Sequence, residues 1–246
     1  MRNLKLTIEY NGAHYCGWQK QKGKKTIQEE IENAIFSLTG EKVVVEGSGR
    51  TDKGVHALAQ VASVSMHHII PCKNLVYALN NLLPEDIRIK RAENAKDDFH
   101  ARFSTKRKTY RYVAQVGGQV SAIENELVGF YPYEVDENLT KSAIEKFVGK
   151  HNFKAFCSAN TQVTNFEREI YDFTISRKGR KFVFEVTGNG FLYNMVRILV
   201  GTALDVGSKK LPLENIDKAF ENGERKLTGK TMPPNGLYLK KVEYKN

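Results

Sequence analysis

Cysteine is scarce in this chain of 246 residues, which contains only Cys16, Cys72 and Cys157. An odd number of cysteines without a C-x-x-C pair argues against a disulfide framework and against a zinc knuckle. The six histidines show neither an H-E-x-x-H pattern nor another ligand spacing, so we expect no metal site. The cysteines are therefore expected to be reduced thiols, as in a cytoplasmic protein.

Long apolar runs are also missing, so the sequence predicts no transmembrane helix. The first residues enter an alternating strand pattern without the features of a signal peptide, which again favours the cytoplasm. Acidic residues are outnumbered: 28 Asp and Glu against 38 Lys and Arg give a net charge of +10. This balance predicts an anionic partner, with nucleic acid as the leading candidate. The alternative is that the basic charge only aids solubility.

The apolar spacing predicts mixed strands and helices. Leu4 to Tyr10 alternates as a strand, and Thr26-x-x-Glu29 has the pattern of a capping box before a helix that Gly40 ends. Further helical spacing and alternation predict more elements of both kinds, distributed over the chain. The expected helices are 73–83, 138–149, 192–207 and one after Pro212, and the expected strands are 86–91, 106–116, 171–175, 182–186 and one after Gly236.

The long connection Gly117 to Glu137 is the expected division between two halves, 1–117 and 118–246. Each half combines strands with two helices. This is a weak indication of duplicated α+β units.

A glycine-rich loop is the most informative stretch. The segment Gly47 to Ala57 follows the β-branched run Val43 to Val45 and precedes an apolar strand, so a tight loop between two strands is predicted. Its glycines let the backbone approach a ligand closely, and they present Arg50 and Asp52 two positions apart. Neither a dinucleotide fingerprint nor a P-loop fits the residues at the required offsets. A β-turn capped by its own aspartate is the alternative.

With its flanks, Gly49-Arg50-Thr51-Asp52-x-Gly54-Val55-His56-Ala57 resembles the signature of the tRNA pseudouridine synthase A family. Other blocks of that family also have counterparts in the same order, and the resemblance covers essentially the whole chain. These blocks are Phe99–Phe103, Thr109–Tyr112, Asn194–Arg197 and Gly236–Leu239.

The resemblance implies an α+β fold made of two ferredoxin-like, RNA-binding-like halves. They would form a central, mainly antiparallel sheet flanked by helices, with the active cleft between them. It also implies a homodimer that isomerises uridine to pseudouridine in the anticodon stem-loop of tRNA, at positions 38 to 40, without a cofactor or metal. The N-terminal half would carry the aspartate and a stacking tyrosine, and the C-terminal half the arginine.

The resemblance assigns Asp52 as the catalytic nucleophile. Breaking a glycosidic bond builds positive charge at the anomeric carbon, which a carboxylate can meet. The sequence leaves open whether Asp52 attacks the sugar, attacks the base or removes a sugar proton. Arg197 is the predicted cation that keeps this carboxylate ionised, against the alternative of an arginine that reaches solvent from the edge of a helix.

Two substrate-binding residues follow from the same resemblance. Tyr110 is predicted to stack on the flipped uracil, although the alternation of its strand alone favours core packing. Arg50 is predicted to occupy the vacated place in the RNA or to hold a flanking phosphate, where an exposed loop charge is the alternative. The roles of Trp18, His100 and Arg102 stay unassigned.

Departures from the family pattern bear on substrate range. Lys53 stands where many members have a small residue, and Phe156-Cys157-Ser158 replaces a segment that often bears arginine, so these departures concern the tRNA position rather than the chemistry. A non-catalytic RNA-binding module and a synthase acting on other RNA are the competing hypotheses. A carboxylate in a basic, RNA-facing loop favours an enzyme over a binding module, because it repels phosphate.

Overall fold

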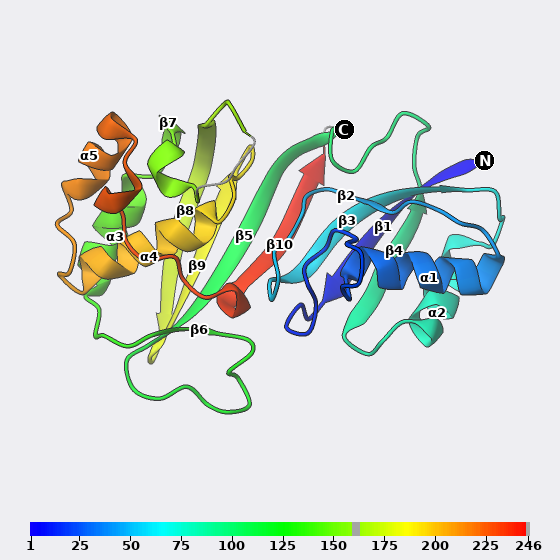
Figure 1. Cartoon of the computed structure of the whole chain (residues 1–246), viewed down its shortest axis with the longest axis horizontal. Coiled ribbons are helices and arrows are strands. Elements are labelled where there is room, and N and C mark those ends of the chain that lie inside the picture. Colours follow the sequence, from blue (N-terminus) through cyan, green and yellow to red (C-terminus); the bar gives the residue numbers. More distant parts are fainter. Residues whose placement is uncertain (159–162, 245–246) are drawn as a thin grey trace. The chain divides into compact units, whose positions relative to one another are not determined.

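The chain divides into two compact units in the computed structural model, which describes residues 1–158 and 163–244 (Figure 1). Unit 1 comprises Met1–Lys106 and the segment from Tyr238 onward, and unit 2 comprises Arg107–Leu237. The predicted division lay at 117/118. The observed one falls earlier, and the closing strand belongs to unit 1, which the linear sequence pattern did not indicate.

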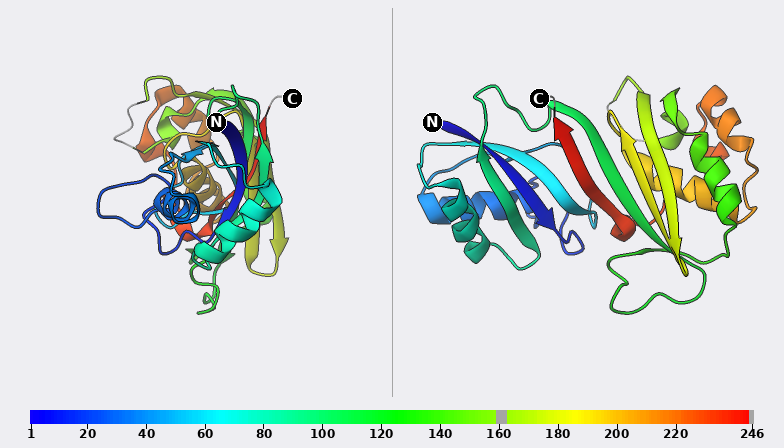
Figure 2. Two further views of the ribbon diagram at one scale, coloured as in Figure 1. Left: turned by 90° about the vertical axis from the view of Figure 1, so that its right-hand side faces the viewer. Right: turned by 180° about the vertical axis from the view of Figure 1, so that it is seen from behind.

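Unit 1 contains a sheet with the strand order β4-β1-β3-β10. Strand β1 pairs antiparallel with β3 and with β4, whereas β10 runs parallel to β3. Helix α1 covers one face of this sheet (Figures 1 and 2) and contacts α2. The elements are β1 (Arg2–Tyr10), α1 (Ile27–Thr39), β2 (Glu46–Gly47), β3 (His56–Met66), α2 (Cys72–Leu82), β4 (Ile87–Asn94) and β10 (Leu237–Tyr244).

The strands of unit 2 follow the order β5-β9-β8-β7, in which neighbouring strands are antiparallel. The short strand β6 runs parallel to β5. Helices α3 and α4 contact each other on one face of this sheet (Figure 2). The elements are β5 (Thr105–Val116), β6 (Gly129–Tyr131), α3 (Glu137–Glu145), β7 (Gly149–Asn152), η1 (Lys154–Phe156), β8 (Glu167–Lys178), β9 (Lys181–Gly188), α4 (Met195–Gly207), α5 (Asn215–Asn222), η2 (Arg225–Leu227) and η3 (Pro234–Gly236).

Most predicted elements are confirmed, and their buried faces explain why. Strand β1 buries Leu4, Leu6 and Ile8, in the alternation that predicted it. Helix α1 ends at Gly40, which adopts the left-handed conformation (φ +74°) that favours glycine. The hairpin of β8 and β9 turns at Gly179, as its sequence indicated.

Some local predictions were wrong. Thr26 is the N-cap residue of α1, but its side chain makes no capping hydrogen bond, so the predicted capping box is absent. The run Val43 to Val45 is not a strand; pairing begins with the two residues of β2. Unit 2 has three α-helices among its described residues, which matches the three helical patterns predicted after residue 118 but not the expectation of two helices in each half.

Candidate active site

The loop Ser48–Val55, which we call the Asp loop, joins β2 to β3 and is fixed to β3 on one side. The amide of Ser48 donates to the carbonyl of Val61 at 2.7 Å. The buried side chain of Gln60 accepts a hydrogen bond from Ser48 Oγ at 2.7 Å and donates to the carbonyl of Gly49 at 2.9 Å. A single glutamine thus holds the entry of the loop through both its amide atoms.

Thr51 fixes the other side of the Asp loop. Its carbonyl accepts from the amide of Trp18 at 3.0 Å, and its hydroxyl bonds the hydroxyl of Tyr10 at 2.7 Å. Gly17 makes this approach possible, because a Cβ at that position would lie 2.4 Å from the Thr51 carbonyl oxygen. Trp18 is buried, which agrees with a role as a core anchor. The residue before Asp52 is therefore anchored through both its backbone and its side chain.

Asp52 itself begins a tight turn. The amide of Val55 donates to the Asp52 carbonyl at 3.1 Å, and Gly54 closes the turn with a φ of +78°. The Asp52 side chain is half-buried, whereas Arg50 is exposed. Arg50 Nε donates to the side-chain oxygen of Gln19 at 3.1 Å. The loop predicted from the glycine spacing is confirmed. It presents the carboxylate of Asp52 and the guanidinium of Arg50 from a fixed backbone.

Buried side chains lie next to the Asp loop. Burial raises the pKa of the Tyr10 phenol, so this hydroxyl stays protonated beside Thr51. His56 follows the loop and is also buried; its Nδ1 accepts a hydrogen bond from the amide of Gly12 at 3.0 Å. Its ring stacks on Tyr238 of β10, with 4.7 Å between ring centroids. The last strand therefore supports the exit of the Asp loop.

Arg197 lies in the first turn of α4 and is half-buried. Its Nε donates to the carbonyl of Met232 at 2.6 Å, and one terminal nitrogen donates to Asn194 Oδ1 at 2.7 Å. Asn194 precedes the helix in a left-handed conformation (φ +59°) and also donates to Ser158 Oγ at 2.9 Å. The guanidinium plane is thus fixed by its own helix and by a distant carbonyl.

That carbonyl belongs to residues 225–232, which we call the Arg225 loop. Arg225 donates to Thr228 Oγ1 at 2.5 Å, to the carbonyl of Gly229 at 2.7 Å and to Thr231 Oγ1 at 3.0 Å. Asp205 of α4 accepts from the amide of Lys230 at 3.0 Å. The Thr202 hydroxyl of α4 also accepts from the amide of Gly229 at 2.9 Å, and the Arg197 carbonyl accepts from the amide of Met232 at 3.2 Å. The loop that orients Arg197 is therefore held together by one arginine and bound to α4 by a carboxylate, a hydroxyl and a backbone carbonyl.

Tyr110 lies on β5, where it is paired with Val186 of β9, and it is 9% exposed. Its ring meets Phe191 edge-on, with the centroids 5.1 Å apart and the planes at 81°. This contact fixes the plane of the Tyr110 ring, which aromatic pairs of this geometry favour.

The predicted site residues fall into two pairs. Asp52 and Arg50 share the Asp loop of unit 1, whereas Tyr110 and Arg197 belong to unit 2. The pairing of Asp52 with Arg197 joins side chains of different units and stays a prediction. Sequence patterns did not reveal Gln60, Arg225 or the Met232 carbonyl, because none of them belongs to a motif. The alternation that buries Tyr10 was visible, but its bond to Thr51 was not.

The described residues contain no group of three His, Cys, Asp or Glu side chains that could hold a metal ion. The three cysteines are free thiols, as predicted. Within residues 1–158 and 163–244, none of the helices has the length and apolar character needed to cross a membrane.

Comparison with known proteins defines the class of enzyme. The family model described as tRNA pseudouridine synthase matches residues 6–104 and 143–245, which include the Asp loop and Arg197. The chain is thus an isomerase of the pseudouridine synthase class.

Full-length relatives narrow this assignment. The tRNA pseudouridine synthase A of Caldicellulosiruptor bescii is 46% identical over 99% of this chain and 100% of its own length. That of Acetivibrio thermocellus is 45% identical with the same coverage, and that of Anoxybacillus flavithermus is 42% identical over the whole of both chains. The chain belongs to the tRNA pseudouridine synthase A family.

Solved structures give a much weaker likeness. The archaeal box H/ACA sRNP Nop10-Cbf5 complex matches with 14% identity and a TM-score of 0.38. The match covers 93% of this chain and 59% of that one. It carries no argument about the fold or the site, and the ferredoxin-like character of the two halves stays a prediction.

Proposed function

We propose that the chain converts uridine to pseudouridine in the anticodon stem-loop of tRNA, at positions 38 to 40, with Asp52 as the nucleophile. The N-glycosidic bond of the target uridine breaks, the base turns, and a carbon–carbon bond to the same ribose forms. Substrate and product are isomers, so no other reactant is consumed. The initial role of Asp52 is attack on the sugar, attack on the base or removal of a sugar proton.

The observation that carries the proposal is the rigid presentation of Asp52. The chain has a net charge of +10, and its family acts on tRNA, whose phosphates a carboxylate repels. A half-buried aspartate on a loop held by Gln60, Tyr10 and Trp18 therefore has a chemical use rather than a binding one. Such positioning keeps a nucleophile at attack distance without further ordering of the loop.

Arg197 is the proposed partner of this carboxylate. Two oxygens, from Met232 and Asn194, already set the plane of its guanidinium. A fixed cation beside Asp52 would oppose the rise in pKa that burial under a bound nucleotide causes, and would keep the acid ionised. We therefore assign Arg197 to the catalytic pair.

Tyr110 and Arg50 are the proposed contacts with the substrate. The edge-on contact with Phe191 fixes the ring of Tyr110, which supports a role in stacking on the extruded uracil. Arg50 is exposed on the same loop as Asp52, which suits a contact with the flanking phosphate or with the place that the base leaves. We further propose that the enzyme works as a homodimer in the cytoplasm, with tRNA spanning both subunits.

The decisive experiment compares wild type with Asp52→Asn and Asp52→Ala on an unmodified tRNA transcript. Pseudouridine is mapped by position, and tRNA affinity is measured in parallel. We expect conversion to fall below detection in both variants while affinity is largely retained. Asp172→Asn, which changes an exposed aspartate of β8, is the matched control and should convert as wild type does.

Each result bears on a separate part of the proposal. Continued turnover by Asp52→Asn would show that another group is the nucleophile. Conversion of uridines outside positions 38 to 40 would overturn the assignment of the anticodon stem-loop but not that of Asp52. Sedimentation of the free protein as a monomer, and of its complex as one protein chain with one tRNA, would overturn the dimer.

A further inference from the structure

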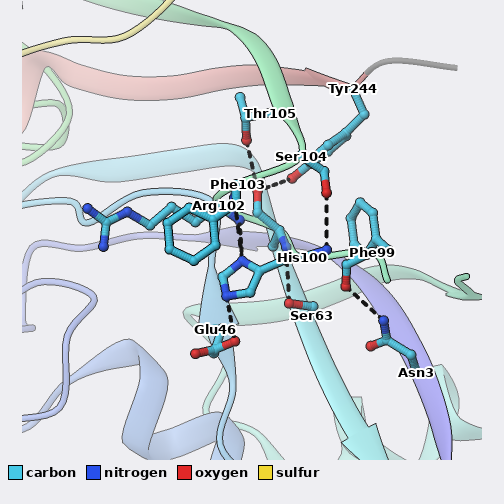
Figure 3. Close-up of polar contacts among 11 residues, drawn as sticks. Asn3, Glu46, Ser63, Phe99, His100, Arg102, Phe103, Ser104, Thr105 and Tyr244 are labelled. Carbon is cyan, nitrogen blue, oxygen red and sulfur yellow. Dashed lines mark hydrogen bonds and ion pairs between the residues drawn. The ribbon is translucent and has the colours of Figure 1, made fainter. Parts of the chain in front are cut away.

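The segment Phe99–Thr105, which we call the Phe103 loop, joins β4 to β5 and is closed by its own hydrogen bonds. The amide of Ser104 donates to the His100 carbonyl at 3.0 Å, and the amide of His100 donates to Ser104 Oγ at 3.2 Å. Figure 3 shows these contacts together with those that bind the loop to its surroundings. The loop is a compact turn in which His100 and Ser104 are joined by two reciprocal hydrogen bonds.

The inner side of the loop is anchored to three strands of unit 1. Ala101 is fully buried, and its amide donates to Ser63 Oγ of β3 at 3.1 Å. Its carbonyl accepts from Tyr244 of β10 at 2.9 Å, and burial raises the pKa of that phenol, which stays a donor. Asn3 of β1 donates to the Phe99 carbonyl at 2.8 Å. These bonds leave the backbone little freedom.

His100 fixes the outer part of the same loop. Its Nδ1 accepts from the amides of Arg102 and Phe103 at 3.1 and 3.4 Å. A ring nitrogen that accepts carries no hydrogen, so Nε2 is the donor to Glu46, 2.8 Å away. The imidazole therefore connects β2 to the backbone of Arg102 and Phe103.

The side chains of Arg102 and Phe103 are exposed to solvent. The Phe103 side chain is 76% exposed although its backbone is held in place. The Arg102 guanidinium carbon lies 5.6 Å from the centre of the Phe103 ring, and the His100 ring centre lies 4.3 Å from it on a tilted plane. Single exposed apolar side chains are common. An exposed ring on a fixed backbone, beside an arginine, is a combination with which proteins bind unpaired bases of RNA.

We propose that Phe103 and Arg102 form a stacking platform for one unpaired base of the tRNA, separate from the target uridine. The base lies on the face of the Phe103 ring, and Arg102 binds the adjoining phosphate. His100 and Glu46 are positioning residues that hold the platform. The proposal rests on tRNA being the substrate and does not depend on which uridine is modified.

The test measures tRNA affinity in the Asp52→Asn background, so that turnover does not enter. Loss of one stacked base weakens binding about ten- to a hundredfold, and we expect that loss for Phe103→Ala and Phe103→Leu. Phe103→Trp should retain affinity, because indole also offers a stacking face. Leucine keeps the apolar area without the ring, so full affinity of Phe103→Leu would overturn the proposal.

Fluorescence supplies a direct readout of stacking. The wild-type chain contains a single, buried tryptophan, Trp18, whose signal can be subtracted. Tryptophan emission of Phe103→Trp should be quenched when tRNA binds. Tyr77→Trp is the matched control, since Tyr77 of α2 is 73% exposed in the same unit, and its emission should not change. Equal quenching at both positions, or none at position 103, would contradict the platform.

The RNA used distinguishes a base from a phosphate contact. Phe103→Ala should bind a fully paired, blunt-ended RNA duplex as well as the parent does, because paired bases are already stacked. Arg102→Gln should weaken the binding of both RNAs and reduce the salt dependence of that binding. If Phe103→Ala lost the same affinity for both RNAs, the ring would be assigned to contact with the RNA backbone. If the substitution changed the oligomeric mass, the ring would be assigned to contact with a second copy of the chain. Failure of these tests leaves the Asp52 assignment intact, since that is read from conversion.

Discussion

The Asp loop and the Arg225 loop both fix a residue of the candidate site, but they use different kinds of anchor. Around the Asp loop the anchors described above are neutral: Gln60, Tyr10, Ser48 and backbone groups. The Arg225 loop is held by a guanidinium and a carboxylate in addition to the neutral Thr202 hydroxyl and a backbone carbonyl.

This difference follows from what each loop presents. Neutral anchors add no net charge beside Asp52, whereas charged groups make stronger bonds to carbonyl oxygens. The Asp loop depends on close backbone fit, and the Arg225 loop depends in addition on the charged side chains of Arg225 and Asp205. The two should therefore fail under different substitutions.

The largest effect is expected from Gly17→Ala. Gly17 has a φ of +89°, and an added Cβ would lie 2.4 Å from the Thr51 carbonyl. Gly23→Ala is the matched control, because Gly23 also has a positive φ (+70°) but no atom within 4 Å of such a Cβ.

Both variants carry the left-handed penalty of about 1 kcal/mol, and only Gly17→Ala displaces the residue before Asp52. We expect at least a hundredfold loss of kcat for Gly17→Ala and near-normal turnover for Gly23→Ala, measured as pseudouridine formed per time. Equal activity of the two variants would show that the Asp loop tolerates movement.

Arg225→Met should have the next largest effect. It removes the bonds to Thr228, Gly229 and Thr231, which should destabilise unit 2 by about 2–3 kcal/mol in urea unfolding. Release of the Met232 carbonyl should also lower kcat by about tenfold through Arg197.

Arg180→Met is the control, because the pair of Arg180 with Glu134 is exposed and contributes about 0–1 kcal/mol. If Arg225→Met unfolds more easily but turns over at the wild-type rate, Arg197 is not positioned through this loop.

The smallest effect concerns a neutral anchor. Tyr10→Phe keeps the ring and loses the bond to Thr51, which should cost about 1 kcal/mol. Burial raises the pKa of Tyr10. As the pH rises above about 10, the usual tyrosine value, the unfolded chain loses a proton that the folded chain retains, so stability falls.

Urea unfolding between pH 8 and 11 should therefore show a shallower decline for Tyr10→Phe than for wild type. Some decline should remain, because burial raises other phenol pKa values as well: those of Tyr15, Tyr131 and Tyr244. Identical slopes would mean that Tyr10 ionises freely in the folded protein.

Local patterns predicted the parts of the fold that local physics determines. Alternation located β1, β5, β8 and β9, and glycine spacing located the Asp loop, because buried faces and turns repeat at short range. Strands of two to four residues, such as β2 and β7, are too short for alternation to reveal them.

The supports of the site were harder to foresee. The Met232 carbonyl that holds Arg197 is a backbone group. Every residue type has one, so the sequence does not indicate its role. Gln60 and Arg225 act through single long-range bonds outside any motif. The exposure of Phe103 was also invisible, since an aromatic residue before a strand equally suits a core.

The return of β10 to unit 1 has a consequence for biosynthesis. Strand β10 lies beside β3, and Tyr238 within it stacks on His56 at the exit of the Asp loop. All of unit 2 is translated before this strand leaves the ribosome. Until then the edge of β3 that pairs with β10 is unpaired at His56 and Ala57, and the Asp loop receives its support from Tyr238 only when synthesis has passed through the second unit.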